Sequence, residues 1–239
     1  MALPLSIYNR TPRRMPHSLG FKRYAMKFGG DGYVEVPHST ILTPNDFTIE
    51  VMVRWTGGSY GLLRKGTVGS AYYTNYAIYY SDTICRVYFG INGTSYWARD
   101  FGTPKPNRWT WLAITFKDAT EVRTYQDGVQ TGVWDIDFSY YKDNSHITVG
   151  AFDWGGLGYF MVGDVAFLRF YNRVLSYAEL LHNLLNYHNP LRNGLVLWLH
   201  DKIVGDTWQD ESGLGNNGTI YGAVKKNLAM WEIRAEVGL

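Results

Sequence analysis

The chain has 239 residues, of which 46% are hydrophobic and 16% aromatic, with 19 Tyr and 9 Trp. This composition can fill a substantial core, and the aromatic content favours strands and binding surfaces over helices. The net charge of +2 indicates no class of partner, the single Cys85 excludes an internal disulfide, and no apolar run is long enough to predict a membrane span. We expect one folded domain.

Residues 1–27 form a basic segment interrupted by three prolines. It holds six basic side chains and no acid, whereas the rest of the chain holds 17 basic against 21 acidic side chains. We expect an extended arm, without the apolar stretch and cleavage site of a secretion signal. We predict that the arm binds other protein subunits of a homo-oligomer or larger assembly, with wrapping on its own domain as the alternative. Nucleic acid is a less favoured partner. The arm's candidate contact residues are Arg10, Arg13, Arg14, Lys22 and Arg23.

From Phe28 onward the chain reads as many short strands separated by turn residues. Phe47 to Trp55 alternates apolar and polar side chains, which predicts a half-buried antiparallel strand. Asp127-Gly128 is a dipeptide that reverses hairpins. We therefore predict an all-β fold, a jelly-roll sandwich of two antiparallel sheets.

The stretch from Val162 to Leu180 predicts a strand that leads into a helix. The strand carries apolar side chains on both faces, so we expect it to lie in the interior. Ser176 and Glu179 have the spacing of a capping box, and Pro190 is a stop signal. This is the one short helix that we predict, near residues 176–188.

Several motifs carry a family resemblance in a consistent order. They are FGGDGYVEVP from Phe28, FTIEVMVRW, RKG, WTWLAITF, YQDG and FLRFYNRVLSYAEL. Together they resemble the laminin G-like (LamG) branch of the concanavalin A-like lectin/glucanase superfamily. The resemblance implies a jelly roll that binds glycans or proteins and is usually not an enzyme.

One part of the resemblance is out of order. Residues 194–222, with GLVLWLHD and WQDESGLGNNGTIYGA, resemble the strand and loop that usually open such a domain. We therefore expect a jelly roll over residues 28–222 and a tail over 223–239. The displaced strand is expected to close its own domain, as in a circular permutation, because chain ends are often close. Donation to a neighbouring subunit and a truncated second domain are the alternatives.

The resemblance also raises the question of a structural calcium ion, although no cofactor is required. Side-chain oxygens suited to calcium are predicted at Asp31, Asp164, Asp210 and Asn216. Against it, Ala166 stands where the family commonly has an aspartate. The alternative is a turn held by side-chain to backbone hydrogen bonds. Zinc is not predicted, because the spacing of His182 and His188 does not place both on one helix face.

Ligand-binding candidates come from segments that place aromatic rings beside amides and acids. Such groups stack on sugar rings and bind hydroxyls, and they also serve protein interfaces. Covering the outer sheet or a subunit contact is the alternative. The candidates are Tyr72, Tyr73, Asn75, Trp97, Tyr140, Tyr141, Asp153 and Trp154.

No catalytic arrangement is predicted. Asp135 and Asp137 share a face of any extended strand but lack the flanking glutamates of a glucanase. We predict a non-catalytic structural or adhesion subunit of a larger assembly, such as a capsid, decoration or appendage protein. Its location would be a virion or an extracellular surface. The alternative is a free-standing carbohydrate-binding lectin, and a glycoside hydrolase is the least favoured of the three.

Overall fold

The computed structural model describes residues 23–58, 61–67, 71–153, 157–228, 233 and 236–237. Within them the fold is all-β and antiparallel with one α-helix, as predicted. None of the helices in this part of the chain is long and apolar enough to cross a membrane.

The strands in chain order are β1 (Arg23–Gly29), β2 (Tyr33–Val36), β3 (Phe47–Gly58), β4 (Gly61–Gly66), β5 (Thr74–Tyr80), β6 (Cys85–Ile91), β7 (Ser95–Asp100), β8 (Thr110–Lys117), β9 (Glu121–Gln126), β10 (Val129–Asp135), β11 (Ile147–Val149), β12 (Phe152–Asp153), β13 (Leu157–Gly158), β14 (Met161–Tyr171), β15 (Leu195–Val204), β16 (Thr207–Asp210), β17 (Gly218–Tyr221) and β18 (Val224–Leu228). The helix is α1 (Tyr177–Leu185), and two 3₁₀ turns are η1 (Thr40–Leu42) and η2 (Ala71–Tyr73).

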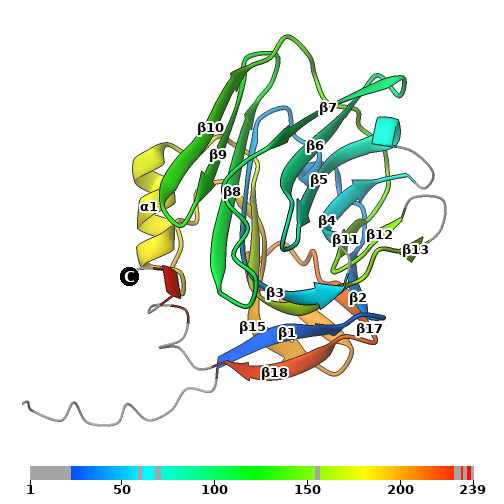
Figure 1. The fold of residues 1–239 in the computed structure, drawn as a ribbon, viewed down its shortest axis with the longest axis vertical. Coiled ribbons are helices and arrows are strands. Elements are labelled where there is room, and N and C mark those ends of the chain that lie inside the picture. Colours follow the sequence, from blue (N-terminus) through cyan, green and yellow to red (C-terminus); the bar gives the residue numbers. More distant parts are fainter. Residues whose placement is uncertain are drawn as a thin grey trace, which may run out of the picture.

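The strands run in the order β10-β9-β8-β3-β14-β15-β16-β17-β2-β11-β4-β5-β6-β7, and this long sheet folds back on itself. Its two halves face each other across the main core (Figure 1). Phe47 of β3 shows the packing, since its ring meets Tyr76 of β5 at 5.4 Å and Phe89 of β6 at 6.1 Å. The predicted jelly-roll sandwich is therefore confirmed.

The displaced segment closes its own domain. β15 pairs with β14, β16 pairs with β15 and β17, and β17 pairs with β2, all antiparallel. The segment after α1 thus occupies the place of the missing opening strand and joins the two halves of the sandwich. These pairings support closure within one chain, which stays the favoured prediction for residues 194–222.

The predicted domain boundaries need correction at both ends. β1 begins at Arg23, inside the predicted arm, and pairs with β14 and with β18. β18 lies in the predicted tail. The reason is that β15 leaves β14 after Leu199, so the first half of β14 has a free edge, which β1 fills.

The helix α1 covers the outer face of the sheet half that contains β8, β3 and β14 (Figure 1). Its predicted capping box is present, with Ser176 and Glu179 each bonded to the other's backbone N–H. Leu180 and Leu184 pack in a second core with Trp111 and Phe167. Tyr171, at the end of β14, also belongs to this cluster, so the helix buries this outer face.

Beneath α1 lies a buried charged network. The carboxylate of Glu50 accepts hydrogen bonds from Arg169 at 3.3 Å and from Asn183 at 3.0 Å, and all three residues have 0% exposure. Arg169 also donates to the backbone carbonyls of Asn183 and Tyr187 at the end of the helix. Desolvation raises the pKa of Glu50. The network ties β3 and β14 to the C-terminal end of α1.

Candidate functional site

The outer face of β5, β6 and β7, on the side opposite α1, is the candidate site. Strand alternation sends Ile78, Val87 and Phe89 into the main core and sends their neighbours outward. The register places Arg86 opposite Asp100 and Tyr88 opposite Ala98 on this outer face.

Aromatic rings form a continuous row across this face. Tyr88 lies 4.4 Å from Tyr79 and 5.7 Å from Tyr96, and Tyr96 stacks with Tyr72 at 6.0 Å. Phe152 of β12 lies against the far end of the row, 4.3 Å from Tyr79. The rings of Tyr79 and Tyr88 are buried in the row, whereas Tyr96 and Tyr72 are 49% and 42% exposed.

A glycine allows the two exposed rings to meet. A side-chain carbon at Gly90 would lie 2.3 Å from the carbonyl oxygen of Tyr72, so only glycine lets η2 approach β6 this closely. Gly90 pairs with Tyr96 across β6 and β7. The backbone of η2 therefore brings Tyr72 over this end of the sheet.

A charged pair borders the aromatic row. Arg86 Nη2 donates to Asp100 Oδ2 at 2.8 Å, Nε donates to the other carboxylate oxygen, and Nη1 donates to the Tyr88 hydroxyl at 3.2 Å. The hydrogen bonds from Arg86 lower the pKa of Asp100, so the carboxylate stays ionised at neutral pH. The Asp100 side chain is 64% exposed, which leaves oxygen lone pairs available to a ligand.

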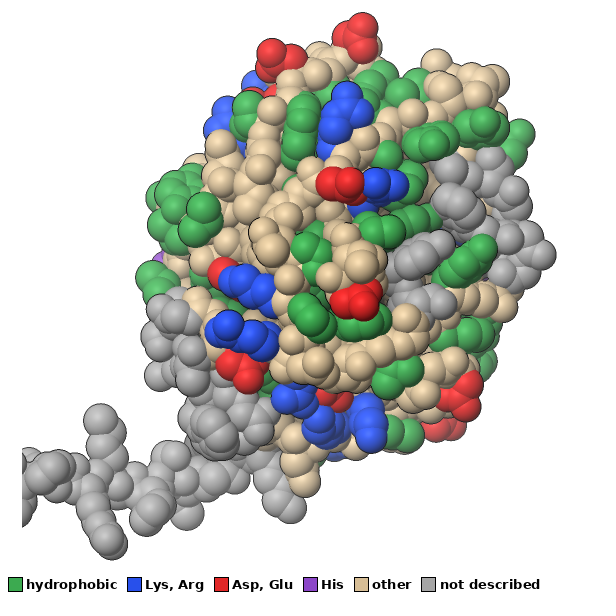
Figure 2. Space-filling model, viewed as in Figure 1, with side chains coloured by type: hydrophobic (Ala, Val, Ile, Leu, Met, Phe, Trp, Pro, Cys, Tyr) green, Lys and Arg blue, Asp and Glu red, His purple; other side chains and the backbone are tan. Residues whose placement is uncertain are grey.

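These residues surround an open groove of about 550 Å³. It is lined by Arg86, Tyr88, Tyr96, Trp97, Ala98, Arg99 and Asp100. Figure 2 shows hydrophobic side chains gathered over β4–β7 with charged ones among them. An exposed ring beside a carboxylate and a guanidinium can stack on a sugar ring and accept hydrogen bonds from its hydroxyl groups.

The predicted ligand residues fall into separate places. Tyr72 is on the candidate face, where its ring stacks with Tyr96, whereas the ring of Tyr73 packs edge to face on Tyr141, 5.5 Å away. Asn75 and Tyr140 are buried, the latter donating its hydroxyl to the Pro44 carbonyl, so neither is available to a ligand.

Of the remaining predicted ligand residues, Trp97 lines the groove. Its ring stacks with Phe89 at 5.8 Å on the inner side of β7. β12 places the backbone of Asp153 opposite Leu157. Trp154 lies outside the described residues.

Sequence reasoning missed the centre of the face, Tyr79, Arg86, Tyr88 and Asp100. The pattern that could have identified them is the two-residue period of β5, β6 and β7, in which aromatic rings occupy both faces of the strands. Periodicity alone does not tell which of two aromatic faces points outward.

The four predicted calcium ligands do not gather. Asp164 is buried, and its Oδ2 accepts hydrogen bonds from Arg54 at 2.6 Å and Lys226 at 2.8 Å. Asp31 is exposed in the turn before β2. A carboxylate that already neutralises two cations does not suit a calcium site, so the donor set does not fit.

The other two residues hold their own loop. Asp210 accepts hydrogen bonds from the backbone N–H groups of Trp198, Ser212 and Asn216, each at 2.9 Å. The amide of Asn216 donates to the Val196 carbonyl at 2.7 Å. This is the hydrogen-bonded turn that the sequence left as the alternative to calcium.

Of the predicted arm residues, Arg10, Arg13, Arg14 and Lys22 lie outside the described part of the chain. Arg23 is in β1, and its guanidinium pairs with Asp201 of β15 at 2.5 Å. Its assignment to a free arm is therefore corrected, because its charge is used within the domain.

Comparisons with known proteins agree with the fold. The family model described as "Concanavalin A-like lectin/glucanases superfamily" matches residues 28–181, more than half of the chain. A search of curated proteins found no match.

Among solved structures, a proposed carbohydrate-binding protein from Bacteroides ovatus is similar with a TM-score of 0.67 and 20% identity, covering 87% of this chain and 60% of that one. The Ruminococcus gnavus IT-sialidase CBM40, bound to α2,3-sialyllactose, has a TM-score of 0.56 and 15% identity over 66% of this chain and 95% of its own. A heptameric pentraxin from Limulus polyphemus has a TM-score of 0.57 and 12% identity, covering 87% of this chain and 96% of the pentraxin chain. This chain thus spans less than two thirds of the Bacteroides protein, and at these identities the likeness shows the fold alone.

Proposed function

The chain belongs to the concanavalin A-like lectin/glucanase superfamily, and from this premise we propose that it is a non-catalytic carbohydrate-binding domain. The observation that carries the proposal is the outer face of β5–β7, where exposed tyrosine rings adjoin the Arg86–Asp100 pair. The proposed or established carbohydrate binding of two structurally similar proteins supports the same reading.

The charged pair favours a neutral glycan. Three of the five N–H donors of Arg86 bond to groups of the protein itself, two to Asp100 and one to Tyr88, so the charge of Arg86 is largely neutralised by Asp100. Arg99, the second arginine of the groove, lies over the Trp97 ring at 4.9 Å and donates to the Ala98 carbonyl. The Asp100 carboxylate repels a ligand carboxylate and accepts hydrogen bonds from hydroxyl groups. We therefore expect neutral sugars to bind at this face in preference to sialylated ones.

The test is a glycan array that carries matched neutral and sialylated oligosaccharides, followed by calorimetric titration of the best neutral ligand. Tyr96→Ala removes the most exposed ring of the row and is expected to weaken binding about tenfold, the equivalent of one lost stacking contact. Tyr72→Ala is expected to act in the same direction.

The matched control is Tyr221→Ala. Tyr221 is 44% exposed and stacks on Tyr33 at 4.7 Å, on a different part of the molecule. This variant should bind glycans as the unmodified chain does. Failure of the unmodified chain to bind any glycan, or equal binding by the Tyr96 and Tyr221 variants, would refute the proposal.

The assembly function predicted from the basic arm stays a prediction. The pentraxin is heptameric, but its likeness to this chain concerns the fold. The comparisons support the glycan-binding alternative better than a virion or appendage role. The surface on which the domain acts, a virion or a cell exterior, is likewise a prediction.

A further inference from the structure

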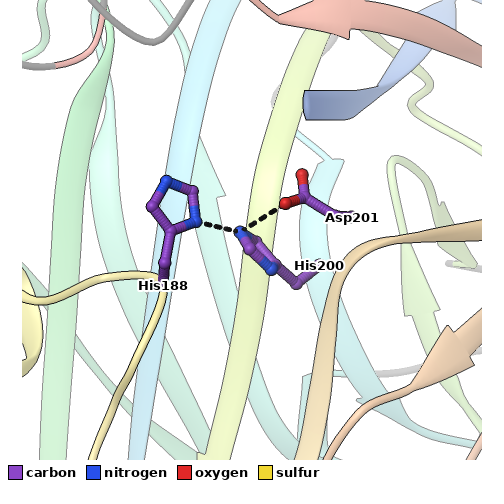
Figure 3. A group of neighbouring side chains, drawn as sticks. All are labelled: His188, His200 and Asp201. Carbon is purple, nitrogen blue, oxygen red and sulfur yellow. Dashed lines mark hydrogen bonds and ion pairs between the residues drawn. The ribbon is translucent and has the colours of Figure 1, made fainter. Parts of the chain in front are cut away.

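A second cluster of functional groups lies where the segment after α1 meets β15, away from the aromatic face. His188 follows the helix, and His200 and Asp201 are consecutive residues of β15 (Figure 3). Among the residues that the structure describes, this is the one group of three His, Cys, Asp or Glu side chains whose ligating atoms converge, all within 4.8 Å of one another.

The distances suit a small metal ion. His188 Nδ1 lies 3.1 Å from His200 Nε2, and that nitrogen lies 3.6 Å from Asp201 Oδ2. Ligands at about 2.0–2.1 Å from a tetrahedral zinc ion are about 3.4 Å apart. His200 Nε2 is therefore near the required spacing from each of the other two atoms, which lie within 4.8 Å of each other. Two imidazoles and one carboxylate are a ligand set that zinc accepts with an open fourth position.

The surroundings prepare the rings for this role. The two facing imidazole nitrogens share a hydrogen bond, so one of them carries a proton without metal. When that proton moves to the other nitrogen of its ring, both facing nitrogens offer a lone pair to a metal. His200 is 3% exposed, and its Nδ1 has no hydrogen-bond partner but lies 3.8 Å from Glu211 Oε1. Metal-ligating histidines commonly direct their second nitrogen at a carboxylate, as here.

A pocket lies beside His188, and a competing cation lies beside Asp201. A pocket of about 180 Å³, lined by Leu185, Asn186, Tyr187, His188 and Asn189, opens beside the first histidine. Asp201 Oδ1 accepts from the Tyr24 N–H at 3.0 Å, while Oδ2 pairs with Arg23, whose side chain is 31% exposed. Arg23 can move into solvent when a metal takes its place, whereas Arg169 opposes the metal charge from within the protein.

We infer that His188, His200 and Asp201 form a binding site for a divalent transition metal of the zinc class, which clamps the segment after α1 to the displaced strand β15. The clamp would hold the permuted segment in place from the side of the helix. Calcium is not expected here, because it prefers oxygen ligands.

The test uses the full chain without an affinity tag, stripped of metal and titrated with ZnCl₂. We expect about one equivalent of zinc to bind by calorimetry and the Tm to rise by at least about 3 °C at saturation, with no rise for CaCl₂. Co²⁺ in place of zinc should give the intense visible absorption of a tetrahedral site.

Three variants separate this site from adventitious binding. His188→Gln, at a partly exposed position, should fold and lose the zinc-dependent Tm shift. His182→Gln, which removes an exposed histidine of α1, should retain it. Arg23→Gln removes the competing cation and should tighten zinc binding about tenfold.

The inference is overturned if zinc leaves the Tm of the unmodified chain unchanged, or if His188→Gln and His182→Gln respond to zinc equally. Weaker zinc binding in Arg23→Gln would also overturn it, because the proposed geometry makes this arginine a competitor. None of these outcomes depends on glycan binding.

Discussion

The two outer faces of the sandwich each carry an arginine–carboxylate pair, but in opposite environments. Arg169 and Glu50, 3.3 Å apart, lie under α1 with 0% of either side chain exposed. Arg86 and Asp100 lie on the uncovered face of β6 and β7 with 34% and 64% exposed. The difference between the two faces is the helix that covers one of them.

Coverage decides what each pair can do. Under α1, the charges require further partners, which Asn183 and the carbonyls at the end of the helix supply. On the open face, water solvates the pair, so its contribution to folding is small and its oxygens remain accessible. The same chemistry therefore holds the fold together on one face and is available for recognition on the other.

The largest expected effect concerns the covered pair. Glu50→Ala leaves Arg169 buried without its counter-charge and removes an acceptor from Asn183, so the free energy of unfolding should fall by about 3–5 kcal/mol. Denaturant-induced unfolding measures the loss. Replacing both Glu50 and Arg169 by Met should recover most of it, because no lone buried charge remains. If Glu50→Ala lowers the free energy of unfolding by less than about 1 kcal/mol, the covered pair is no more important for folding than the open one.

A smaller effect is expected where the covering helix begins. Hydrogen bonds from Arg173, with further ones from Ser176, lower the pKa of Glu179 from 4.5 to about 2. The ionised carboxylate therefore stabilises the fold above pH 4.5, and this contribution is lost as the pH falls from 4.5 towards 2. Glu179→Gln keeps the capping geometry but removes the charge.

The Glu179→Gln variant should be less stable than the unmodified chain by about 1 kcal/mol at pH 7. The difference should shrink steadily as the pH falls from 4.5 towards 2 and vanish below the folded-state pKa. Unfolding curves recorded at pH 7, 4 and 2.5 check this. A difference that does not change with pH would mean that the charge does not hold the start of the helix.

The smallest effect on stability is expected on the open face. Asp100→Asn should change the free energy of unfolding by less than about 0.5 kcal/mol, because both partners are solvated. The same variant should weaken the binding of a neutral glycan, since the amide accepts fewer hydrogen bonds than the carboxylate. A stability loss as large as that of Glu50→Ala would show that the open pair is structural too.

Much of the fold could be predicted from local patterns. The alternation in Phe47 to Trp55 predicts the strand β3, but the predicted half-burial is wrong, since Thr48 and Glu50 on its polar face lie buried on the side that α1 covers. The spacing of Ser176 and Glu179 predicts the start of α1. Both depend on residues close in sequence, whose hydrogen bonds and facing directions are local. The predicted boundary between arm and domain at residue 27 was wrong because β1 pairs with the edge of β14, a strand far along the chain.

The candidate site was only partly predicted for the same reason. Tyr72 was identified from its neighbours, whereas Arg86 and Asp100 come together through the register of β6 and β7. Asn75 and Tyr140 have a ligand-like composition but are buried by elements distant in sequence.

The sequence by itself determined the all-β class, the family and the displaced strand, because each is written in the order and periodicity of neighbouring residues. Only the tertiary structure decided which face of β5–β7 remains open and which lies under α1. It also decided that His188 meets His200 and Asp201, since this contact needs the loop between α1 and β15 to fold back. Both outcomes depend on long-range packing, in which burial selects among side chains that look alike in the sequence.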